Sequence, residues 1–246
     1  MYYPILFHIG KINFYTHGLM MVLGAALGGV ILYNLAKRDN KRTDFIFDLV
    51  IYVILGGLVG ARILYLILYY NQFAGFREML MIWYGGLVSY GGLIGGFTVA
   101  YFVIRAKKEN ILGWFDIGSI GLFAGWAIGR IGCFLTNDSL GVASNSILAI
   151  GGRLPVTLFE SVWSLVVAVA GYLLWRIRDK VRLPEGAIFL VTIGLYALGR
   201  FVIDFFRQED VFFLGLKAGQ VGSLAVFIIA VGILAVLWKK RRLKWF

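Results

Sequence analysis

The chain has 246 residues, of which 60% are hydrophobic, 15% are charged and 32 are glycine, and its formal net charge is +11. Average soluble proteins carry roughly 25% charged residues, so a soluble domain of this composition would lack the polar surface needed to cover its core. One Cys excludes a disulfide framework, and two His leave little for a metal site. The composition therefore predicts an all-α, polytopic membrane protein.

Seven stretches are long and apolar enough to cross a bilayer core of about 30 Å, which needs roughly 20 residues per helix. The expected spans are 18–36, 45–70, 84–104, 111–135, 156–175, 187–207 and 221–238. The segment before the first span contains Pro4, His8 and Lys11, and it is expected to be an amphipathic flank rather than a signal peptide. Because no polar gap is long enough for a soluble domain, residues 1–246 are expected to form a single integral membrane domain.

Lys and Arg residues gather at one end of these spans. Sixteen of them lie in the loops 37–42, 105–108 and 176–182 and in the tail 239–244, whereas Lys11, Arg77, Arg153 and Lys217 lie at the other end. Cytoplasmic loops carry the excess of Lys and Arg, so the N-terminus is expected outside and the C-terminus in the cytoplasm. These cations flank apolar spans and form no separate basic domain, so no nucleic-acid partner is expected.

Four arginines are not explained by this topology, because Arg62, Arg130, Arg200 and Arg207 lie within or at the ends of spans. An Arg at the bilayer centre costs about 2.5 kcal/mol or more. A rise of about 1.5 Å per residue places all four in the outer half of the membrane. One explanation is an ion-pair network with acidic neighbours. The favoured explanation is an anion site for a phospholipid headgroup of the outer leaflet, because the guanidinium fork binds two phosphate oxygens at once.

The sixth span carries both signs of charge on one face. Arg200 and Asp204 are four residues apart, and Asp204 and Arg207 are three apart. Asp138 follows the fourth span and Glu160 begins the fifth, so acidic groups are expected at the same depth. The two cations that bracket Asp204 predict a local excess of positive charge.

Glycines recur at small-xxx-small spacing in the second, third and fourth spans, and this pattern predicts close helix packing. The pairs are Gly56 with Gly60, Gly91 with Gly95, and Gly125 with Gly129. Two further glycine pairs, Gly85–Gly86 and Gly91–Gly92, flank Tyr90 at the outer end of the third span. Such pairs permit a broken helix or a close approach of lipid.

A polar run follows the fourth span, with Cys133, Thr136, Asn137, Asp138 and Ser139 in close succession. Cys133 could act as a nucleophile. No His is near it in sequence and its flanks are apolar, so a small buried thiol is the favoured interpretation.

The run from Gly129 to Gly141, with Arg130 near its start, resembles the G-R-x-G-N-F-x-N-x-E-x-x-G signature of prolipoprotein diacylglyceryl transferases. Further segments resemble motifs of the same family in the same order. They are Arg62 with Tyr65, the glycine-rich segment 85–95, residues 155–160 ending in Glu160, and Gly199 to Gln208 with Arg200, Asp204 and Arg207. The similarity covers the first to the last expected span, and it implies the same seven-helix topology with the N-terminus outside.

The sequence also departs from the family pattern. Cys133 and Thr136 stand where the signature has Asn, and Asp138 and Asp204 stand for Glu. Tyr90 stands where many members have a catalytic His, and His17 stands where many have Tyr. The external insert between the fourth and fifth spans is almost missing.

The resemblance implies that a diacylglyceryl group moves from phosphatidylglycerol to the thiol of a lipobox Cys in a secreted precursor, in a bacterial inner membrane with the site facing the outer leaflet. Neither a metal nor a cofactor is implied. The catalytic residues would be Arg130, Arg200, Arg207, Tyr90 and His17, and the substrate-binding residues Arg62, Asn137, Asp138, Glu160, Asp204 and Gly141. His17 and Tyr90 are expected to exchange the family's two roles, unless His17 merely lies at the headgroup boundary.

Two other functions remain open from the sequence, and so does a scaffold without catalytic activity. The missing insert is compatible with a related lipid-modifying transferase that uses another acceptor. A lipid or anion transporter ranks lower, because transporters often contain inverted repeats and the sequence contains no convincing repeat.

Overall fold

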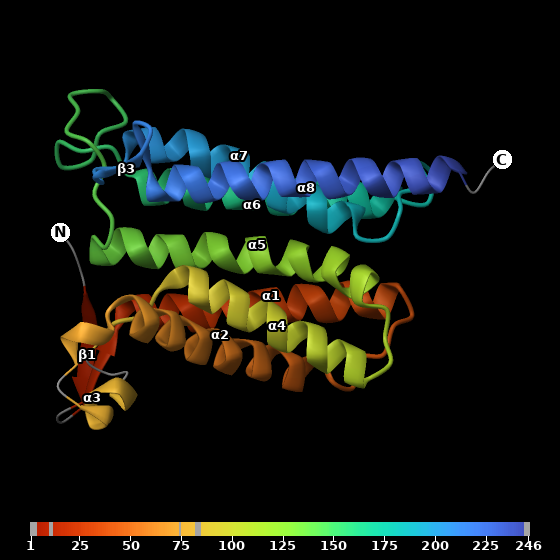
Figure 1. Cartoon of the computed structure of the whole chain (residues 1–246), viewed down its shortest axis with the longest axis horizontal. Helices are drawn as coiled ribbons and strands as arrows, with labels where there is room; N and C mark the ends of the chain where they lie inside the picture. Colours follow the sequence, from red (N-terminus) through yellow and green to blue (C-terminus); the bar gives the residue numbers. More distant parts are fainter. Residues whose placement is uncertain (1–3, 10–11, 74, 82–84, 244–246) are drawn as a thin grey trace. The chain divides into compact units, whose positions relative to one another are not determined.

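The computed structural model describes residues 4–9, 12–73, 75–81 and 85–243, most of which lie in helices (Figure 1). The chain forms two compact units. The first unit comprises residues 1–39 and 115–246, and the second comprises residues 40–114.

The first unit begins with a short hairpin that leads directly into a long helix. Helices α5 to α8 follow, and a polar connection joins α7 to α8. The elements are β1 (Ile5–Ile9), β2 (Ile12–Tyr15), α1 (Thr16–Arg38), α5 (Ile111–Thr136, which starts within the second unit), α6 (Val156–Ile177), α7 (Ala187–Ile203), η3 (Asp204–Phe206), β3 (Val211–Phe213), β4 (Leu216–Lys217) and α8 (Ala218–Leu243).

Helices α1 and α5 approach each other through glycines. A methyl group at Gly28 would lie 2.8 Å from the carbonyl oxygen of Gly121, and one at Gly24 would collide with the carbonyl of Gly125. Side chains larger than hydrogen are therefore excluded from this seam, and the two backbones lie in van der Waals contact. The close packing predicted for Gly125 is confirmed.

The second unit contains α2 (Ile46–Leu68), η1 (Tyr70–Gln72), α3 (Phe76–Leu80) and α4 (Ser89–Ala106). Its core is another glycine seam. A methyl group at Gly60 would lie 2.9 Å from the Cα of Gly95, and one at Gly56 would lie 3.2 Å from the carbonyl oxygen of Gly95. The close helix packing predicted from the spacing of these glycines is confirmed, and the structure adds that α2 packs against α4.

Six helices in the described part of the chain are long and apolar enough to cross a membrane, namely α1, α2, α5, α6, α7 extended to Phe206, and α8. Helix α4, with 18 residues, corresponds to the remaining expected span. It begins at Ser89, later than the predicted start near residue 84, because Gly85 and Gly86 adopt positive φ angles of 88° and 79°. Residues 82–84 lie outside the described part.

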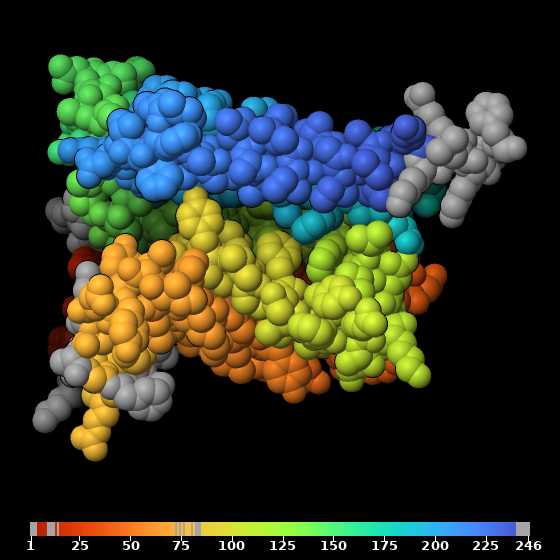
Figure 2. Space-filling view, viewed as in Figure 1, coloured from red at the N-terminus to blue at the C-terminus, as the bar shows by residue number. Residues whose placement is uncertain are grey.

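The helices present apolar side chains at their surfaces, as lipid-facing helices do. Helix α8, the dark blue band of Figure 2, carries Ile228, Ile229 and Ile233, which are each about half exposed. Helix α6 likewise exposes Val162 and Leu165. The surface of each unit therefore fits a bilayer better than water.

A buried carboxylate at the opposite end from the polar connection fixes the start of α7. Asp116 of α5 accepts hydrogen bonds from the backbone N–H groups of Gly186 and Phe189, both at 2.8 Å. The first N–H groups of a helix have no partner within the helix, so a carboxylate from a neighbouring helix stabilises them. The contact joins α5 to α7.

We expect Asp116→Ala to lower the free energy of unfolding by about 2 kcal/mol, because it leaves two buried donors unpaired. The midpoint of thermal unfolding in detergent should fall by about 5 °C. Asp179→Ala is the matched control, since the Asp179 side chain is 91% exposed. Equal midpoints for the two variants would contradict the assigned cap.

Candidate functional site

Five charged side chains of the first unit meet at the end of the helices nearest the polar connection. Arg130 comes from the last turns of α5, Glu160 from the second turn of α6, and Arg200 from the last turn of α7. Asp204 begins η3, and Arg207 follows it. We call these five residues the arginine–carboxylate cluster.

Glu160 is the centre of this cluster. Its Oε1 accepts hydrogen bonds from Nη1 of Arg200 at 2.8 Å and from Nη2 of Arg207 at 2.7 Å. Its Oε2 lies 3.0 Å from Nε of Arg130. One carboxylate thus joins α5, α6 and the segment after α7.

Asp204 neutralises part of the remaining charge. Its Oδ1 accepts a hydrogen bond from Nε of Arg207 at 3.0 Å, and its Oδ2 lies 3.7 Å from Nε of Arg200. The predicted bracketing of Asp204 by two cations is confirmed. Three guanidinium groups against two carboxylates leave a charge of +1 in the cluster.

The three arginines differ in how accessible they are. The side chain of Arg207 is 4% exposed and also donates to Oγ of Ser139 at 3.0 Å. The side chains of Arg130 and Arg200 are 14% and 20% exposed. Arg207 is therefore enclosed by the cluster, whereas Arg130 and Arg200 retain exposed surface, and the predicted catalytic role of all three stays a prediction.

Backbone hydrogen bonds join the segment after α5 to the segment after α7, beside the cluster. Val142 N–H donates to the carbonyl of Phe206 at 2.9 Å, and Gln208 N–H donates to that of Leu140 at 2.8 Å. Gly141 forms an antiparallel bridge with Arg207. A methyl group at Gly141 would collide with the carbonyl of Leu154, so glycine is required there for close backbone contact.

Asn137 and Gly141 line a cavity of about 20 Å³, together with Phe134, Ser139, Leu140, Ile150, Arg153, Leu154, Pro155 and Thr157. This volume holds about one water molecule and not a lipid headgroup. The backbone conformation explains why an Asn stands at position 137. Its φ of 60° lies in the left-handed region, which Asn tolerates better than most residues.

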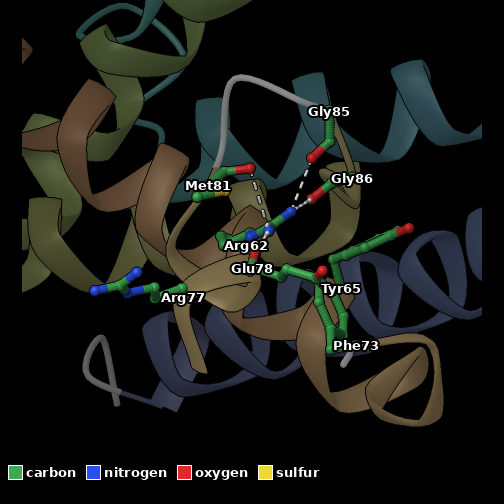
Figure 3. A pocket seen from close by; sticks show the side chains of 8 residues that line it. All are labelled: Arg62, Tyr65, Phe73, Arg77, Glu78, Met81, Gly85 and Gly86. Atoms are coloured by element: carbon green, nitrogen blue, oxygen red, sulfur yellow. Dashed lines mark hydrogen bonds between the residues drawn. The ribbon is translucent and has the colours of Figure 1, made fainter. Parts of the chain in front are cut away.

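Arg62 organises the second unit (Figure 3). A guanidinium group has five N–H donors, and five backbone carbonyls accept from this one. They belong to Met79 at 2.9 Å, Gly85 at 2.8 Å, Gly86 at 3.0 Å, Glu78 at 2.8 Å and Met81 at 3.4 Å. Arg62 thus ties residues 78–81 and 85–86 to α2.

A cavity of about 640 Å³ adjoins Arg62, lined by Tyr65, Phe73, Arg77, Glu78, Met81, Gly85 and Gly86 as well. Sites for small ligands commonly have volumes of about 300–1,000 Å³. The rings of Tyr65 and Phe73 lie 5.5 and 5.4 Å from the Arg62 guanidinium carbon.

Tyr90, the second residue of α4, is 45% exposed, and its predicted exchange of roles with His17 stays a prediction.

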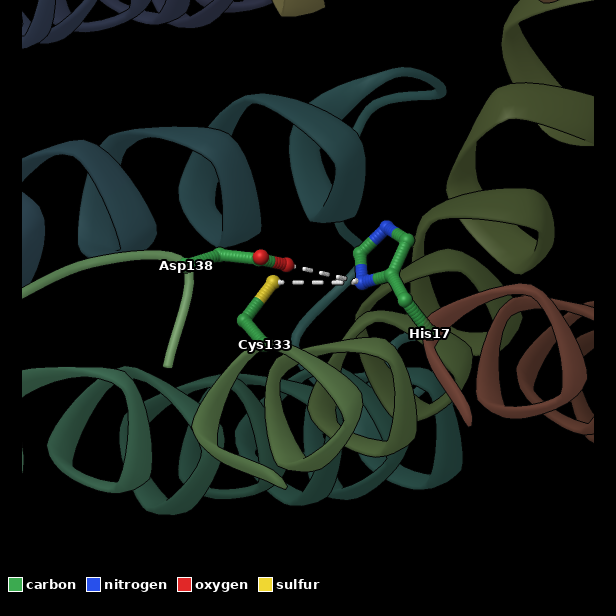
Figure 4. Close-up of side chains that lie close together, drawn as sticks. All are labelled: His17, Cys133 and Asp138. Atoms are coloured by element: carbon green, nitrogen blue, oxygen red, sulfur yellow. Dashed lines mark hydrogen bonds and ion pairs between the residues drawn. The ribbon is translucent and has the colours of Figure 1, made fainter. Parts of the chain in front are cut away.

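The side chains of His17, Cys133 and Asp138, from separate parts of the sequence, lie close together in the structure (Figure 4). Nδ1 of His17 lies 3.7 Å from Sγ of Cys133 and 3.5 Å from Oδ2 of Asp138. The interpretation of Cys133 as a small buried thiol is confirmed. The fold adds His17, which is distant in the sequence, as a neighbour of its sulfur. Nη1 of Arg130 lies 3.8 Å from the same sulfur, so this group adjoins the arginine–carboxylate cluster.

The C-terminus of α5 explains how Asp138 reaches Cys133. The N–H of Asp138 donates to the carbonyl of Cys133 at 3.1 Å, and the N–H of Asn137 donates to that of Phe134 at 3.2 Å. These two bonds, with a left-handed residue between the helix and Asp138, form a Schellman motif. The motif turns the chain back so that Asp138 lies over the last turn of the helix.

Comparisons with known proteins agree with the motifs. Residues 4–237 match the family model for prolipoprotein diacylglyceryl transferase. A phosphatidylglycerol–prolipoprotein diacylglyceryl transferase of Clostridium perfringens is 30% identical over 95% of this chain and 93% of its own length. The enzymes of that name from Streptococcus uberis and Lysinibacillus sphaericus are also 30% identical, over 97% and 98% of this chain and 96% and 93% of their own lengths.

We expect Glu160→Gln to lower the free energy of unfolding by about 3–5 kcal/mol, because it leaves the three guanidinium groups of the cluster, one of them buried, with one carboxylate. The thermal midpoint, followed by tryptophan fluorescence in detergent, should fall by about 10 °C. Glu209→Gln is the control, since the Glu209 side chain also lies beside Arg207, at 3.5 Å, but is 42% exposed. Similar shifts for the two variants would contradict the central role of Glu160.

Proposed function

The chain belongs to the prolipoprotein diacylglyceryl transferase family, a family of membrane transferases in lipoprotein biosynthesis, and we propose that it moves diacylglyceryl from phosphatidylglycerol to the lipobox Cys thiol of a secreted precursor. The names of the relatives supply the donor and the class of acceptor. The observation that carries the proposal is the buried arginine–carboxylate cluster with its excess of positive charge. Such a cluster suits a phosphate ester whose leaving group gains charge.

The reaction breaks the bond between the glycerol carbon and the phosphate oxygen, and it forms a thioether with the acceptor sulfur. Glycerol phosphate leaves with the electron pair of the broken bond. Arg130 and Arg200, the partly exposed cations, are the groups that stabilise this charge. Their effect is larger than in water because the surrounding helices exclude solvent. Arg207 holds the cluster in shape.

The remaining residues that the sequence singled out divide by environment. Glu160 and Asp204 position the arginines, and Gly141 permits the backbone contact above them. Arg62 shapes a cavity that could accept part of a lipid, and Asn137 orients Asp138. We propose that His17, which lies beside Cys133 and Arg130, contacts the acceptor thiol. We propose that Tyr90, which is exposed at the start of α4, contacts the substrate.

The membrane side follows from charge. We place the arginine–carboxylate cluster at the outer leaflet of a bacterial inner membrane, because the Lys- and Arg-rich loops lie at the opposite ends of the spans. Phosphatidylglycerol and secreted precursors both reach that leaflet.

A second acceptor class is the alternative. Residues 137–155, between α5 and α6, form a short connection that pairs with itself and with residues 206–208. This short connection offers less surface to a precursor peptide than a long insert would. A related transferase with another acceptor would keep the same lipid chemistry.

An assay that gives the purified protein phosphatidylglycerol vesicles and a lipobox peptide distinguishes between the two proposed acceptors. We expect glycerol phosphate release that depends on the peptide, with a matching mass increase on its Cys. Release without peptide modification would favour the other acceptor. An absence of release would overturn the proposed lipid reaction.

Arg200→Lys should lower kcat by about 10–100-fold, because Lys keeps the charge but loses the planar fork that faces both Glu160 and the leaving phosphate. The thermal midpoint should change little. Arg105→Lys is the control, on the exposed end of α4. An unchanged kcat in Arg200→Lys would remove Arg200 from the catalytic groups.

A further inference from the structure

We propose that His17, Cys133 and Asp138 form a binding site for a zinc ion, with one coordination position left open. Nδ1, Sγ and Oδ2 of these residues all lie within 4.8 Å of one another. They are an imidazole, a thiol and a carboxylate, the three side-chain types that bind zinc in proteins.

The spacing of the three atoms fits one metal ion. Zinc–ligand bonds of about 2.0–2.3 Å in a tetrahedron separate neighbouring ligand atoms by roughly 3.3–3.6 Å. The observed separations from Nδ1 are 3.7 Å to sulfur and 3.5 Å to oxygen. The third separation, between sulfur and oxygen, lies within 4.8 Å, so side-chain rotation would bring the three atoms to bonding distance of one ion. A mixed nitrogen and sulfur set selects zinc or a similar transition metal over magnesium and calcium, which prefer oxygen.

Each ligand is held by the backbone rather than by a flexible loop. Cys133 lies in the last turns of α5, and His17 is the second residue of α1. The seam between these helices brings the Cα of His17 to 3.5 Å from the position of a methyl group at Gly132. The Schellman motif at Asn137 fixes Asp138. Ligands positioned in this way need little ordering when a metal binds.

The charges balance as well. A zinc ion with one thiolate and one carboxylate is neutral, and a second thiolate in the open position gives the site a charge of −1 beside the positive arginine–carboxylate cluster. The guanidinium of Arg130 lies 3.8 Å from the sulfur while its Nε faces Glu160. It can donate to a second lone pair of the thiolate and stabilise the charged ligand.

The open position faces accessible space. The side chains of His17 and Asp138 are 42% and 49% exposed. Three protein ligands with an open fourth position are typical of catalytic rather than structural zinc sites. Provided that the proposed function holds, the acceptor thiol occupies this position and releases its proton to solvent, because a thiol bound to zinc is deprotonated. The thiolate then attacks the glycerol carbon beside Arg130, and the phosphate leaves as described above.

Metal binding to the purified full-length chain tests the site without lipid or peptide. Protein without a polyhistidine tag is stripped with a chelator, loaded with zinc or cobalt(II), desalted and assayed. We expect one metal ion per chain and a thiolate-to-cobalt charge-transfer band. His17→Asn, Cys133→Ser and Asp138→Asn should each weaken binding by more than the roughly 10–100-fold that loss of an outer-shell partner costs. The Cys133 variant should also lose the band.

His8→Asn is the matched control, because His8 is the chain's other histidine and lies exposed on β1. It should bind metal as the unchanged protein does. Zinc should also slow alkylation of Cys133, the only Cys, in the unchanged protein, so the test does not depend on variants that fold poorly. Substoichiometric binding, a band that survives Cys133→Ser, or alkylation indifferent to zinc would each overturn the site.

The open position is tested with N-acetylcysteine amide added to the cobalt-loaded protein. A stronger charge-transfer band is expected, because a second thiolate joins the metal. An unchanged band would overturn the role in thiol activation. Because neither experiment uses phosphatidylglycerol, failure of the proposed transferase reaction would appear separately, as a lack of glycerol phosphate release.

Discussion

A single buried carboxylate constrains the first unit. Glu160 has no exposed side-chain surface, and three guanidinium groups from α5, α7 and the following segment contact it. A carboxylate offers about four acceptor sites, so it can serve three arginines at once. An ionised group buried in this way is tolerated only when it is paired, and each arginine in turn needs the carboxylate. The helix ends are therefore fixed together by charge rather than by apolar packing alone.

The sequence offered two explanations of the intramembrane arginines, an ion-pair network and an anion site, and this mutual dependence makes them compatible. The cluster is an ion-pair network, and it also keeps what an anion site needs, because its members differ in exposure. Arg207 is enclosed by Glu160, Asp204 and Ser139 and serves the network. Arg130 and Arg200 retain exposed surface, and the cluster has one more cation than it has carboxylates. A network that is fully neutralised would hold helices together but attract no phosphate.

The sequence predicted the helices, their glycine seams and the charged face of the sixth span, because period, length and spacing are local properties. Pairings between distant segments were not predicted. Asp116 as a cap for α7 and Glu160 as the shared partner of three arginines depend on helix neighbours. One long-range contact, between His17 and the end of α5, follows directly once the register of α1 against α5 is known. Gly24 meets Gly125 and Gly28 meets Gly121, so antiparallel helices with this register place residue 17 beside residue 132.

That register gives the substitutions a common location. His17, Cys133 and Asp138 each differ from the residue that the family pattern has, and the three lie in different parts of the sequence. The glycine seam brings the first to the second, and the Schellman motif brings the third back over the helix end. A carboxylate is kept at Asp138, so the new elements are the imidazole of His17 and the thiol of Cys133, whose reactive atoms meet that carboxylate within 4.8 Å. One bound ion would give these three groups a common role, which their separate positions in the sequence do not suggest.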